Sequence, residues 1–507
     1  MLYIVKIIKR ANAVLLAGLL ALSCGKAPRR DVTVAMEDDI ITLDPYLHDD
    51  SVTHSVLANI YDALVSFDRE MRLEPALARR WENPDDLTWR FFLRSGVRFH
   101  DGRPLTAADV KFSLERARRG KLGHYLSAVR AVRAVDSLTV EVETFKPYPV
   151  LLNKLTFIAV MPEGAPEPVA APVGTGAYRF LSYAPGADMA LEADPGHWRG
   201  RPAIERAVFK VLPEDSQRMR ALTVGQVDLI RDLDDRDREW LGGQPGIEVV
   251  SRPGLGVTLL GVNFVLPGPL RNRDVRSAVF WALDPAGLVL ASGMDASPTN
   301  QLVSPYVVGY APGDERARPD LERARQLLRR AGYGRGLRLT LEMSKTAADK
   351  VGAELRRQLS LVGVDLNVVG YDWPELSARL ARHGSPFFLV GWSCSSGDAS
   401  DLLDACLHSR DSLSRGSANW GGYGDPALDL LIERSGEVID SRERIDLLHR
   451  AMGLAAEAAP LLPLYVRNRS YGRRAGLLFQ PRQDGRIRLC DLRWSPATHA
   501  NGTAGRP

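Results

Sequence analysis

The chain has 507 residues, of which 45% are hydrophobic and 25% charged, a composition typical of a soluble globular protein with about two to four domains. The formal net charge is +4, and the basic residues are interleaved with acids instead of forming blocks, so the sequence does not predict a nucleic-acid partner. The four cysteines include no Cys-x-x-Cys pair and no Cys/His cluster, and no phosphate-binding or cofactor motif is present, so we expect no metal and no cofactor.

The start of the chain has the pattern of a leader. Basic residues precede a short apolar run, and small residues lead to Cys24, which predicts a secretory signal over residues 1–23. Residues 21–24 resemble the lipobox of bacterial lipoproteins, which implies a lipidated Cys24 and a tether over residues 24–30. A plain cleaved signal and an uncleaved anchor are the open alternatives. All three place the body of the chain outside the cytoplasm, in the periplasm or at the cell surface.

Two kinds of pattern follow the leader. Residues 31–36 are a candidate strand, and residues 52–68 carry apolar residues with a helical period. Strand-forming aromatic residues stand on both sides of Ser95 and Gly96. Such a pair of runs around a short turn predicts a β-hairpin over residues 87–102.

The next elements are a capped helix and a strand. Thr106 is followed three residues later by Asp109, a capping-box arrangement that predicts a helix beginning at Ala107. Residues 131–145 alternate between apolar and polar side chains, as a strand does. The proline-rich run over residues 162–172 interrupts this pattern and indicates a crossing between substructures.

The second half of the chain has a strand and helix rhythm. Residues 176–194 predict a second hairpin with Pro185 and Gly186 at its turn, and Gly225 ends a predicted helix. Over residues 321–372, helices and strands alternate. This alternation predicts an α/β fold in which helices cover a mixed, partly parallel sheet.

One stretch, residues 387–401, changes character midway. It begins as a buried strand and becomes small, polar and acidic after Trp392. Of the three cysteines beyond the leader, Cys394 lies within this stretch and Cys406 follows it closely. In an oxidising compartment these two could pair and leave Cys490 free, or all three could be unpaired thiols.

Motifs in a fixed order carry a resemblance to a known family. They include "LDP" (43–45), "NIYDALVSFD" (59–68), "VGTGAYRF" (173–180), "HWRGRPAIERAVFKVLPE" (197–214) and "SANWGGYGDPALDLLI" (417–432). Together they resemble the family 5 extracytoplasmic solute-binding proteins, the peptide-, dipeptide- and nickel-binding lipoproteins that serve ABC importers. The likeness covers nearly the whole mature chain.

The resemblance implies a two-lobed α/β fold of the class II-like periplasmic-binding-protein type. Its mixed sheets would form two lobes that close on a ligand as a hinged trap, with an extra subdomain inserted in lobe one. The implied boundaries are 31–45, 172–265 and 466–507 for the main part of lobe one, 46–171 for its inserted subdomain, and 266–465 for lobe two.

The resemblance also implies a binding site between the lobes. Its substrate-binding residues would be His48, Asp49, Asp50 and Ser51 on one side, with Gly391, Trp392, Ser393, Ser395 and Asp398 on the other. Peptide-binding members commonly carry an aspartate three residues after this tryptophan, which pairs with the ammonium of the peptide. Ser395 stands there instead, and a hydroxyl accepts a hydrogen bond without neutralising the charge. Asp398 is the nearest acid, with Asp401, Asp49 and Asp50 as other candidates.

His48 and His54 are the other notable pair near this site. They are six residues apart, which fits neither a helical pair nor a strand pair of metal ligands, so we interpret them as cleft or surface histidines.

The implied function is that of a substrate-binding lipoprotein of an ABC importer. It would bind a peptide or similar small solute and deliver it to permease subunits, acting as a monomer attached to the membrane by its lipid. No catalytic residues are predicted, so we do not expect an enzyme. Two alternatives remain: a sensor or scaffold lipoprotein on the same fold, to which Ser395 points, and a secreted hydrolase.

Overall fold

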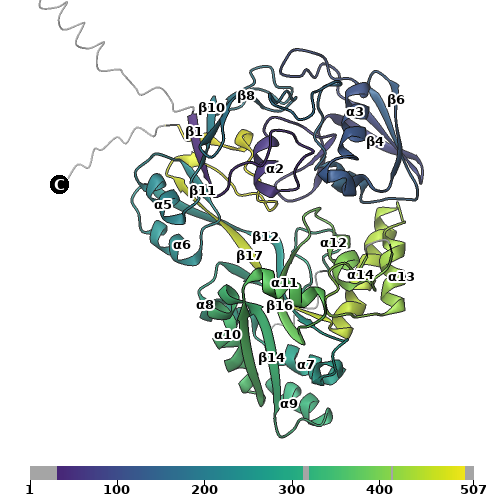
Figure 1. Cartoon of the computed structure of the whole chain (residues 1–507), viewed down its shortest axis with the longest axis vertical. Helices are drawn as coiled ribbons and strands as arrows, with labels where there is room; N and C mark the ends of the chain where they lie inside the picture. The colour runs from purple at the N-terminus through teal and green to yellow at the C-terminus, as the bar shows by residue number, and fades with distance from the viewer. Residues whose placement is uncertain (1–30, 312–318, 413–414, 497–507) are drawn as a thin grey trace, which may run out of the picture.

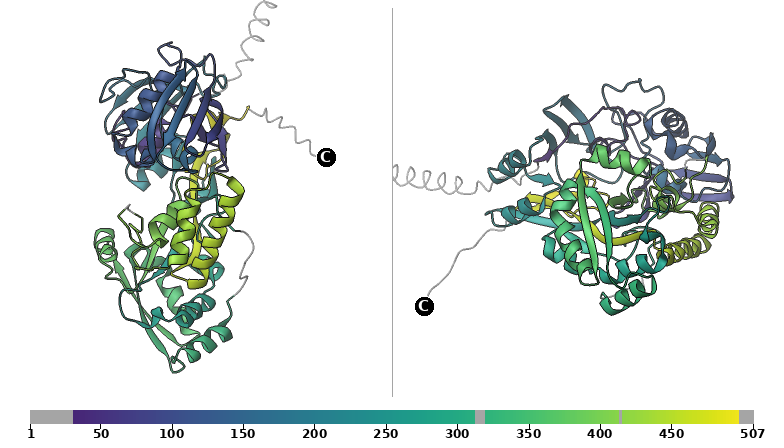
Figure 2. Two further views of the ribbon diagram at one scale, coloured as in Figure 1. Left: turned by 90° about the vertical axis from the view of Figure 1, so that its right-hand side faces the viewer. Right: turned by 60° about the horizontal axis from the view of Figure 1, so that its bottom comes forward.

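The computed structural model describes residues 31–311, 319–412 and 415–496. The predicted signal and the predicted lipidation site at Cys24 lie outside these ranges. The described chain forms two lobes, which Figures 1 and 2 show one above the other. Among these residues, no helix combines the length and the apolar character needed to cross a membrane.

Two long strands, β12 (Ile247–Val262) and β17 (Leu461–Arg474), run side by side from one lobe into the other (Figure 1). They pair antiparallel, but the register shifts between Pro253 and Val257. Proline has no backbone N–H to donate, so a break in the ladder at this point is expected. We call the part drawn above this pair in Figure 1 lobe one and the part below it lobe two.

One sheet of 11 strands spans both lobes. Its order is β15-β14-β16-β12-β17-β11-β1-β10-β9-β8, with β13 paired to β17. Strand β1 is parallel to β10 and β11, and β14 is parallel to β15 and β16, whereas β12 and β17 pair antiparallel, which confirms the expected mixed sheet. Besides β12 and β17, the strands are β1 (Asp31–Met36), β8 (Tyr178–Ala184), β9 (Asp188–Ala193), β10 (Arg206–Val211), β11 (Leu229–Arg231), β13 (Ala296–Pro298), β14 (Leu337–Ser344), β15 (Val364–Tyr371) and β16 (Phe387–Ser393).

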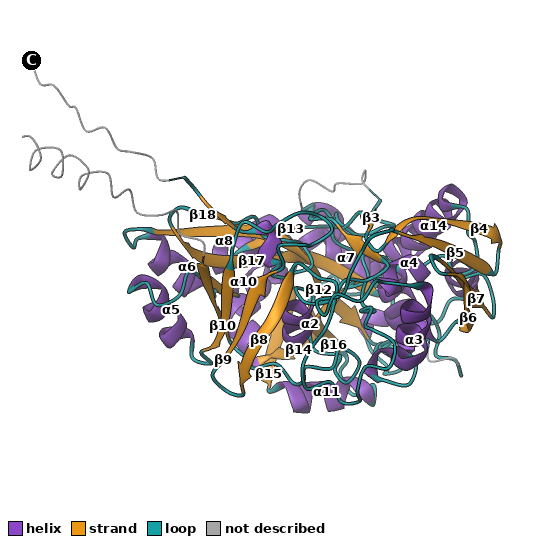
Figure 3. Cartoon of the chain, turned by 90° about the horizontal axis from the view of Figure 1, so that it is seen from above, coloured by secondary structure: helices purple, strands orange, loops and turns teal. Residues whose placement is uncertain are grey.

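A four-stranded antiparallel sheet lies at the end of lobe one opposite to β8, β9 and β10, as Figure 3 shows. Its order is β4-β5-β7-β6, and its strands are β4 (Ala78–Asp85), β5 (Thr88–Leu93), β6 (Val129–Asp136) and β7 (Thr139–Thr144). The predicted hairpin around Ser95 and Gly96 is wrong, because β5 pairs with β4 and β7 instead of with the residues that follow it. Strand β4 contains Pro84, and it is an edge strand, where a missing N–H is tolerated.

Helices cover the sheets of both lobes. In lobe one they are α2 (Ser51–Leu57), α3 (Ala107–Ala117), α4 (Leu151–Leu155), α5 (Asp215–Thr223) and α6 (Asp235–Gly242). In lobe two they are α7 (Arg273–Ala282), α8 (Pro285–Ser292), α9 (Leu321–Arg330), α10 (Lys345–Ser360), α11 (Trp373–Ala381), α12 (Ser400–Leu402), α13 (Pro426–Ser435) and α14 (Ser441–Ala458). Two further pairs of short strands are β2 (Val65–Phe67) with β3 (Leu73–Pro75), and β18 (Leu477–Leu478) with β19 (Arg493–Trp494).

The first helix of lobe one is shorter than its apolar pattern predicts. Helix α2 ends at Leu57 instead of continuing toward residue 68. The Asn59 side chain donates hydrogen bonds to the carbonyl oxygens of Ser55 (3.1 Å) and Val56 (3.2 Å). An amide side chain that binds the carbonyls of the last turn competes with continued helix, which explains the early end. The helix predicted to begin at Ala107 is confirmed as α3.

Lobe one and lobe two each have an apolar core, and a third cluster packs Phe67 and Met71 of lobe one with lobe-two residues such as Leu402. The end of the chain belongs to the core of lobe one. Leu477, Phe479, Ile487 and Leu489 are all buried with the side chains of residues 32–211. The chain therefore returns through β17 to lobe one and places residues 479–489 against α2. The residue boundaries expected for the lobes stay predictions.

The "LDP" motif has a structural role. Asp44 is completely buried and binds Arg116 from α3. Its carboxylate also accepts hydrogen bonds from the backbone N–H groups of Tyr46 (3.0 Å) and Val169 (3.1 Å). A buried carboxylate needs such partners, and here they fix the chain that leads into α2.

Candidate functional site

A cavity of about 160 Å³ lies where the segment before α2 meets the end of β16. Of the predicted residues, it is lined by His48, Asp49, Asp50 and Ser51 from lobe one and by Ser393 and Ser395 from lobe two. Residues distant in sequence and carried by different lobes therefore share one cavity.

One of the two acids before α2 is engaged in building the helix. Asp50 is its N-cap, and the carboxylate accepts hydrogen bonds from the backbone N–H groups of Val52 (3.2 Å) and Thr53 (2.6 Å). Burial alone would raise the pKa of Asp50, but these hydrogen bonds hold it below its usual value. Asp49 is exposed, and no partner for its carboxylate occurs among the described residues, so it is available to a ligand.

The sequence analysis missed a second wall of the cavity. It consists of Gln483, Asp484, Gly485 and Arg486, with Arg231 and Arg469 beside them. The segment is held on α2, because the N–H of Ile487 donates to Ser55 Oγ (2.9 Å) and the N–H of Leu489 donates to Asn59 Oδ1 (2.8 Å). The only signal in the sequence was the alternation of charged residues around Gly485, and no sequence pattern indicated that this segment lies beside His48.

Most charged side chains of this wall form ion pairs with residues beside the cavity. Arg482 donates to Asp484 at 3.1 Å, and although burial raises the pKa of Asp484, the attraction of Arg482 holds it below its usual value. Arg231 and Arg469 share Asp232, at 2.7 Å and 3.3 Å. These ion pairs order the wall before any ligand arrives.

The two histidines lie together in lobe one. His48 is 2% exposed, and its ring centroid is 6.2 Å from that of His54. Burial lowers the pKa of both imidazoles, and for His54 the nearby Arg486 lowers it further, so both rings are neutral near pH 7. Both ring nitrogens of His48 and Nε2 of His54 are buried without a hydrogen-bond partner in the described chain.

Two of the predicted lobe-two residues lie outside this cavity. Gly391 is a strand residue of β16 and pairs with Thr258 of β12. Trp392 lines a separate small cavity in lobe two and packs edge-on against Trp420, with ring centroids 6.2 Å apart. In this conformation Trp392 therefore packs on lobe two and offers no face to the cavity between the lobes.

Asp398, expected as a ligand acid, also lies outside this cavity. It is 1% exposed, and both carboxylate oxygens accept hydrogen bonds from Arg444 of α14 at 2.8 Å. Burial would raise the pKa of Asp398, but Arg444 and the N–H of Ser400 hold it below its usual value. Its charge is therefore neutralised inside lobe two.

Asp401, three residues after Asp398, joins the lobes. Asp401 accepts a hydrogen bond from Lys154 Nζ of α4 at 2.7 Å and another from the N–H of Ser396 at 2.8 Å. Asn153 donates to the carbonyl oxygen of Ser396 at 2.8 Å. These contacts hold the loop that carries Ser395 against lobe one, beside the cavity.

The cysteine alternatives resolve in favour of thiols. Cys394, Cys406 and Cys490 are all unpaired. Burial raises the pKa of Cys406 and Cys394, as expected for thiols inside an apolar core. Within residues 31–311, 319–412 and 415–496, no group of three or more His, Cys, Asp or Glu side chains is placed to hold a metal ion.

A comparison of the sequence with protein families identifies the fold's relatives. The profile of the bacterial extracellular solute-binding proteins, family 5, matches residues 72–414. The chain belongs to this family.

Individual members of family 5 are similar along nearly the whole chain. The glutathione-binding protein GsiB of Escherichia coli (strain K12) is 27% identical over 485 residues, which cover 90% of this chain and 94% of GsiB. HbpA2 from Haemophilus parasuis superposes with a TM-score of 0.82 at 22% identity, over 92% of this chain and 100% of HbpA2. The unliganded open form of the periplasmic murein tripeptide binding protein MppA gives 0.83 at 19% identity, over 92% and 98%. These structures show that the fold is the two-lobed one.

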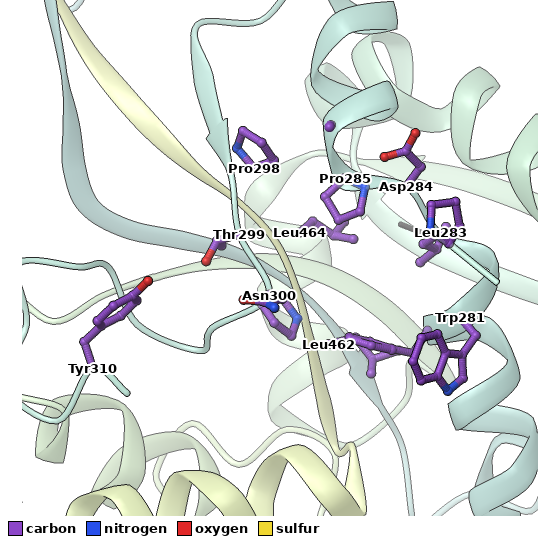
Figure 4. Close-up of a pocket in the computed structure, with 14 residues that line it drawn as sticks. Trp281, Leu283, Asp284, Pro285, Pro298, Thr299, Asn300, Tyr310, Leu462 and Leu464 are labelled. Carbon is purple, nitrogen blue, oxygen red and sulfur yellow. The ribbon is translucent and has the colours of Figure 1, made fainter. Parts of the chain in front are cut away.

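This family 5 protein also has a larger cavity, of about 300 Å³, inside lobe two (Figure 4). It lies between the end of α7, the start of α8 and β17, and apolar side chains such as Leu462 and Leu464 line much of it. Asp284 supplies its carboxylate. None of the described residues that line this cavity belongs to lobe one, so closure of the lobes would not enclose a solute there.

Proposed function

We propose that the protein is the solute-binding lipoprotein of an ABC importer and that it binds a peptide or similar small solute between its lobes. The observation that carries this proposal is the shared cavity, which brings His48 to Ser51 of lobe one to Ser393 and Ser395 of lobe two. Membership of a solute-binding family supports the same function. The protein would act as a monomer, pass its solute to a membrane permease and perform no catalytic step.

Closure of the lobes would complete the site. Strands β12 and β17 are the long connections between the lobes, and the register break at Pro253 gives their pairing a place to bend. Removal of water on closure strengthens each hydrogen bond and ion pair to the solute. Cleft closure therefore supplies both affinity and the shape that a permease would recognise.

The lining suits a solute with the groups of a peptide. Asp49 and the hydroxyls of Ser51, Ser393 and Ser395 can accept hydrogen bonds from an ammonium or from amide N–H groups. The arginines of the second wall can donate to carboxylates. The similarity to GsiB, which is named for glutathione, supports a peptide-like solute for this chain as well.

The lipid anchor is a separate part of the proposal. Lipidation of Cys24 would hold the protein at a bacterial membrane on its extracytoplasmic side. We expect Cys24→Ser to move the protein from the membrane fraction to the soluble extracytoplasmic fraction, measured by fractionation and mass spectrometry of the mature N-terminus. If the variant stays in the membrane fraction, the anchor at Cys24 is wrong.

A solute screen tests the binding function. Di- and tripeptides, glutathione, sugars and nickel–histidine complexes are added to the folded protein, and we expect a member of the peptide group to raise the melting temperature and to narrow the small-angle X-ray scattering envelope. Ser395→Ala and Asp49→Asn should reduce the shift without altering the ligand-free melting temperature. A screen in which no compound changes either quantity would contradict the proposal.

A further inference from the structure

Arg486 is a largely buried cation that packs on an aromatic ring and has no close ion pair. Its guanidinium lies 4.9 Å from the ring centroid of Phe157, and its side chain is 11% exposed. Its ion pair with Asp484 is long, at 3.9 Å, and Asp484 is already bound by Arg482. In the described chain the guanidinium makes no hydrogen bond. Burial lowers the pKa of Arg486 to about 10.

Other polar groups without partners surround the same cavity. Gln483 is 1% exposed, and neither its amide oxygen nor its amide nitrogen has a hydrogen-bond partner in the described chain. His48 and His54 add unpartnered ring nitrogens, and all three residues line the cavity with Arg486. Buried polar groups without partners are costly, so a concentration of them around one cavity points to a ligand that satisfies them.

We propose that the solute carries a carboxylate and that this carboxylate binds to Arg486 and Gln483 of lobe one. This inference rests on the proposed function and names the chemistry of its solute. A carboxylate accepts two N–H bonds from a guanidinium and has further acceptor positions for the Gln483 amide and a neutral histidine. The carboxylate-binding side of the site is then complete in lobe one before the lobes close.

The charge balance favours a carboxylate over a phosphate. Among the described cations that line the cavity, Arg231 and Arg469 have an ion pair of 3.3 Å or less, whereas that of Arg486 is 3.9 Å. A single negative charge on the solute would neutralise Arg486. A phosphate dianion would place a second negative charge near Asp49, Asp50 and Asp484, which line the same cavity. Carboxylates that line the same cavity repel a second negative charge and disfavour the binding of a dianion.

The first test needs no solute. Because Arg486 is a buried charge without a hydrogen bond, Arg486→Gln should raise the urea midpoint of the ligand-free protein. Arg493→Gln, an exposed arginine on the same C-terminal segment, is the matched control and should leave the midpoint unchanged. A lowered midpoint for Arg486→Gln would show that Arg486 is a structural residue and would overturn the inference.

The second test uses simple anions. Sodium acetate should raise the melting temperature of the wild-type protein and of Arg493→Gln above that in sodium chloride of equal ionic strength, and should not do so in Arg486→Gln. An equal response in all three proteins, or a larger response to sodium phosphate than to acetate, would overturn the inference. For a carboxylate-bearing peptide found in the solute screen, we expect Arg486→Gln to weaken binding by roughly 10- to 100-fold.

The two proposals fail separately. If acetate acts through Arg486 but no solute narrows the scattering envelope, the importer function is wrong and the carboxylate site stands. If a solute closes the lobes and its C-terminal amide binds as tightly as the free acid, the function stands and the carboxylate site is wrong.

Discussion

The ion pair between Asp398 and Arg444 tests whether an acid near the cleft stabilises the fold or binds a solute. Asp398→Asn keeps the shape of the side chain and removes its charge, so the buried Arg444 loses its counter-ion. Breaking a buried pair by removing one partner costs about 3–5 kcal/mol. Arg444 keeps one hydrogen bond, from Nε to the carbonyl oxygen of Ser435 at 2.9 Å, so we expect a loss of about 3 kcal/mol, at the lower end of that range.

Urea denaturation followed by circular dichroism measures this loss. The double variant of Asp398→Asn with Arg444→Met should lose less stability than the sum of the two single variants, because no unpaired charge remains. Asp49→Asn is the control and should leave the free energy of unfolding unchanged. The reasoning is refuted if Asp398→Asn unfolds like the wild-type protein but no longer binds a solute, since Asp398 would then be a ligand residue.

The pair also predicts a pH dependence. The folded-state pKa of Asp398 is held below its usual value, so its contribution to stability is present above about pH 4 and is lost as the pH falls through the folded-state pKa. The difference in unfolding free energy between wild type and Asp398→Asn should therefore be full at pH 7 and shrink at acidic pH.

Three further variants test other parts of the structure. Burial raises the pKa of Asp404 to about 6, so the native state retains a proton that the unfolded state releases near pH 4, and Asp404→Asn should raise the urea midpoint at pH 7.5 but not at pH 4. Equal midpoints at pH 7.5 would contradict this. Lys154→Met removes the 2.7 Å contact with Asp401 between the lobes and should lower the unfolding free energy by about 1–3 kcal/mol. It should also enlarge the radius of gyration measured by X-ray scattering. An unchanged radius would show that the contact does not hold the lobes together. A Cβ on Gly174 would lie 2.0 Å from the carbonyl oxygen of Ile60, so Gly174→Ala should lower the unfolding free energy by about 1–3 kcal/mol, and an unaltered midpoint would mean that the backbone relaxes freely.

Elements with a strong local signal were predicted well. The turn at Pro185 and Gly186 joins β8 and β9, and the capping pair of Thr106 and Asp109 stands at the start of α3. The hairpin around Ser95 failed because strand pairing is decided by tertiary contacts: the same β5 residues could pair forward or backward, and β4 offered the longer partner.

The candidate site shows the same division. The family resemblance indicated the two segments that share the cavity, but it could not tell a buried acid from an exposed one. Arg444, the partner of Asp398, lies on α14, and no local pattern connects the two residues. The wall that contains Arg486 was missed because β17 carries the chain back to lobe one, and that return is a property of the whole fold.

If the cleft binds a solute as we propose, recognition depends on the charged side chains that form no close ion pair within the fold. Asp398 and Asp484 are bound by arginines within their lobes, and Asp401 is bound by a lysine across the lobes. Among the described residues that line the cavity, Asp49 then keeps an exposed carboxylate and Arg486 a guanidinium without a hydrogen bond. The solute that we propose, with a carboxylate and an ammonium, would pair with both Arg486 and Asp49.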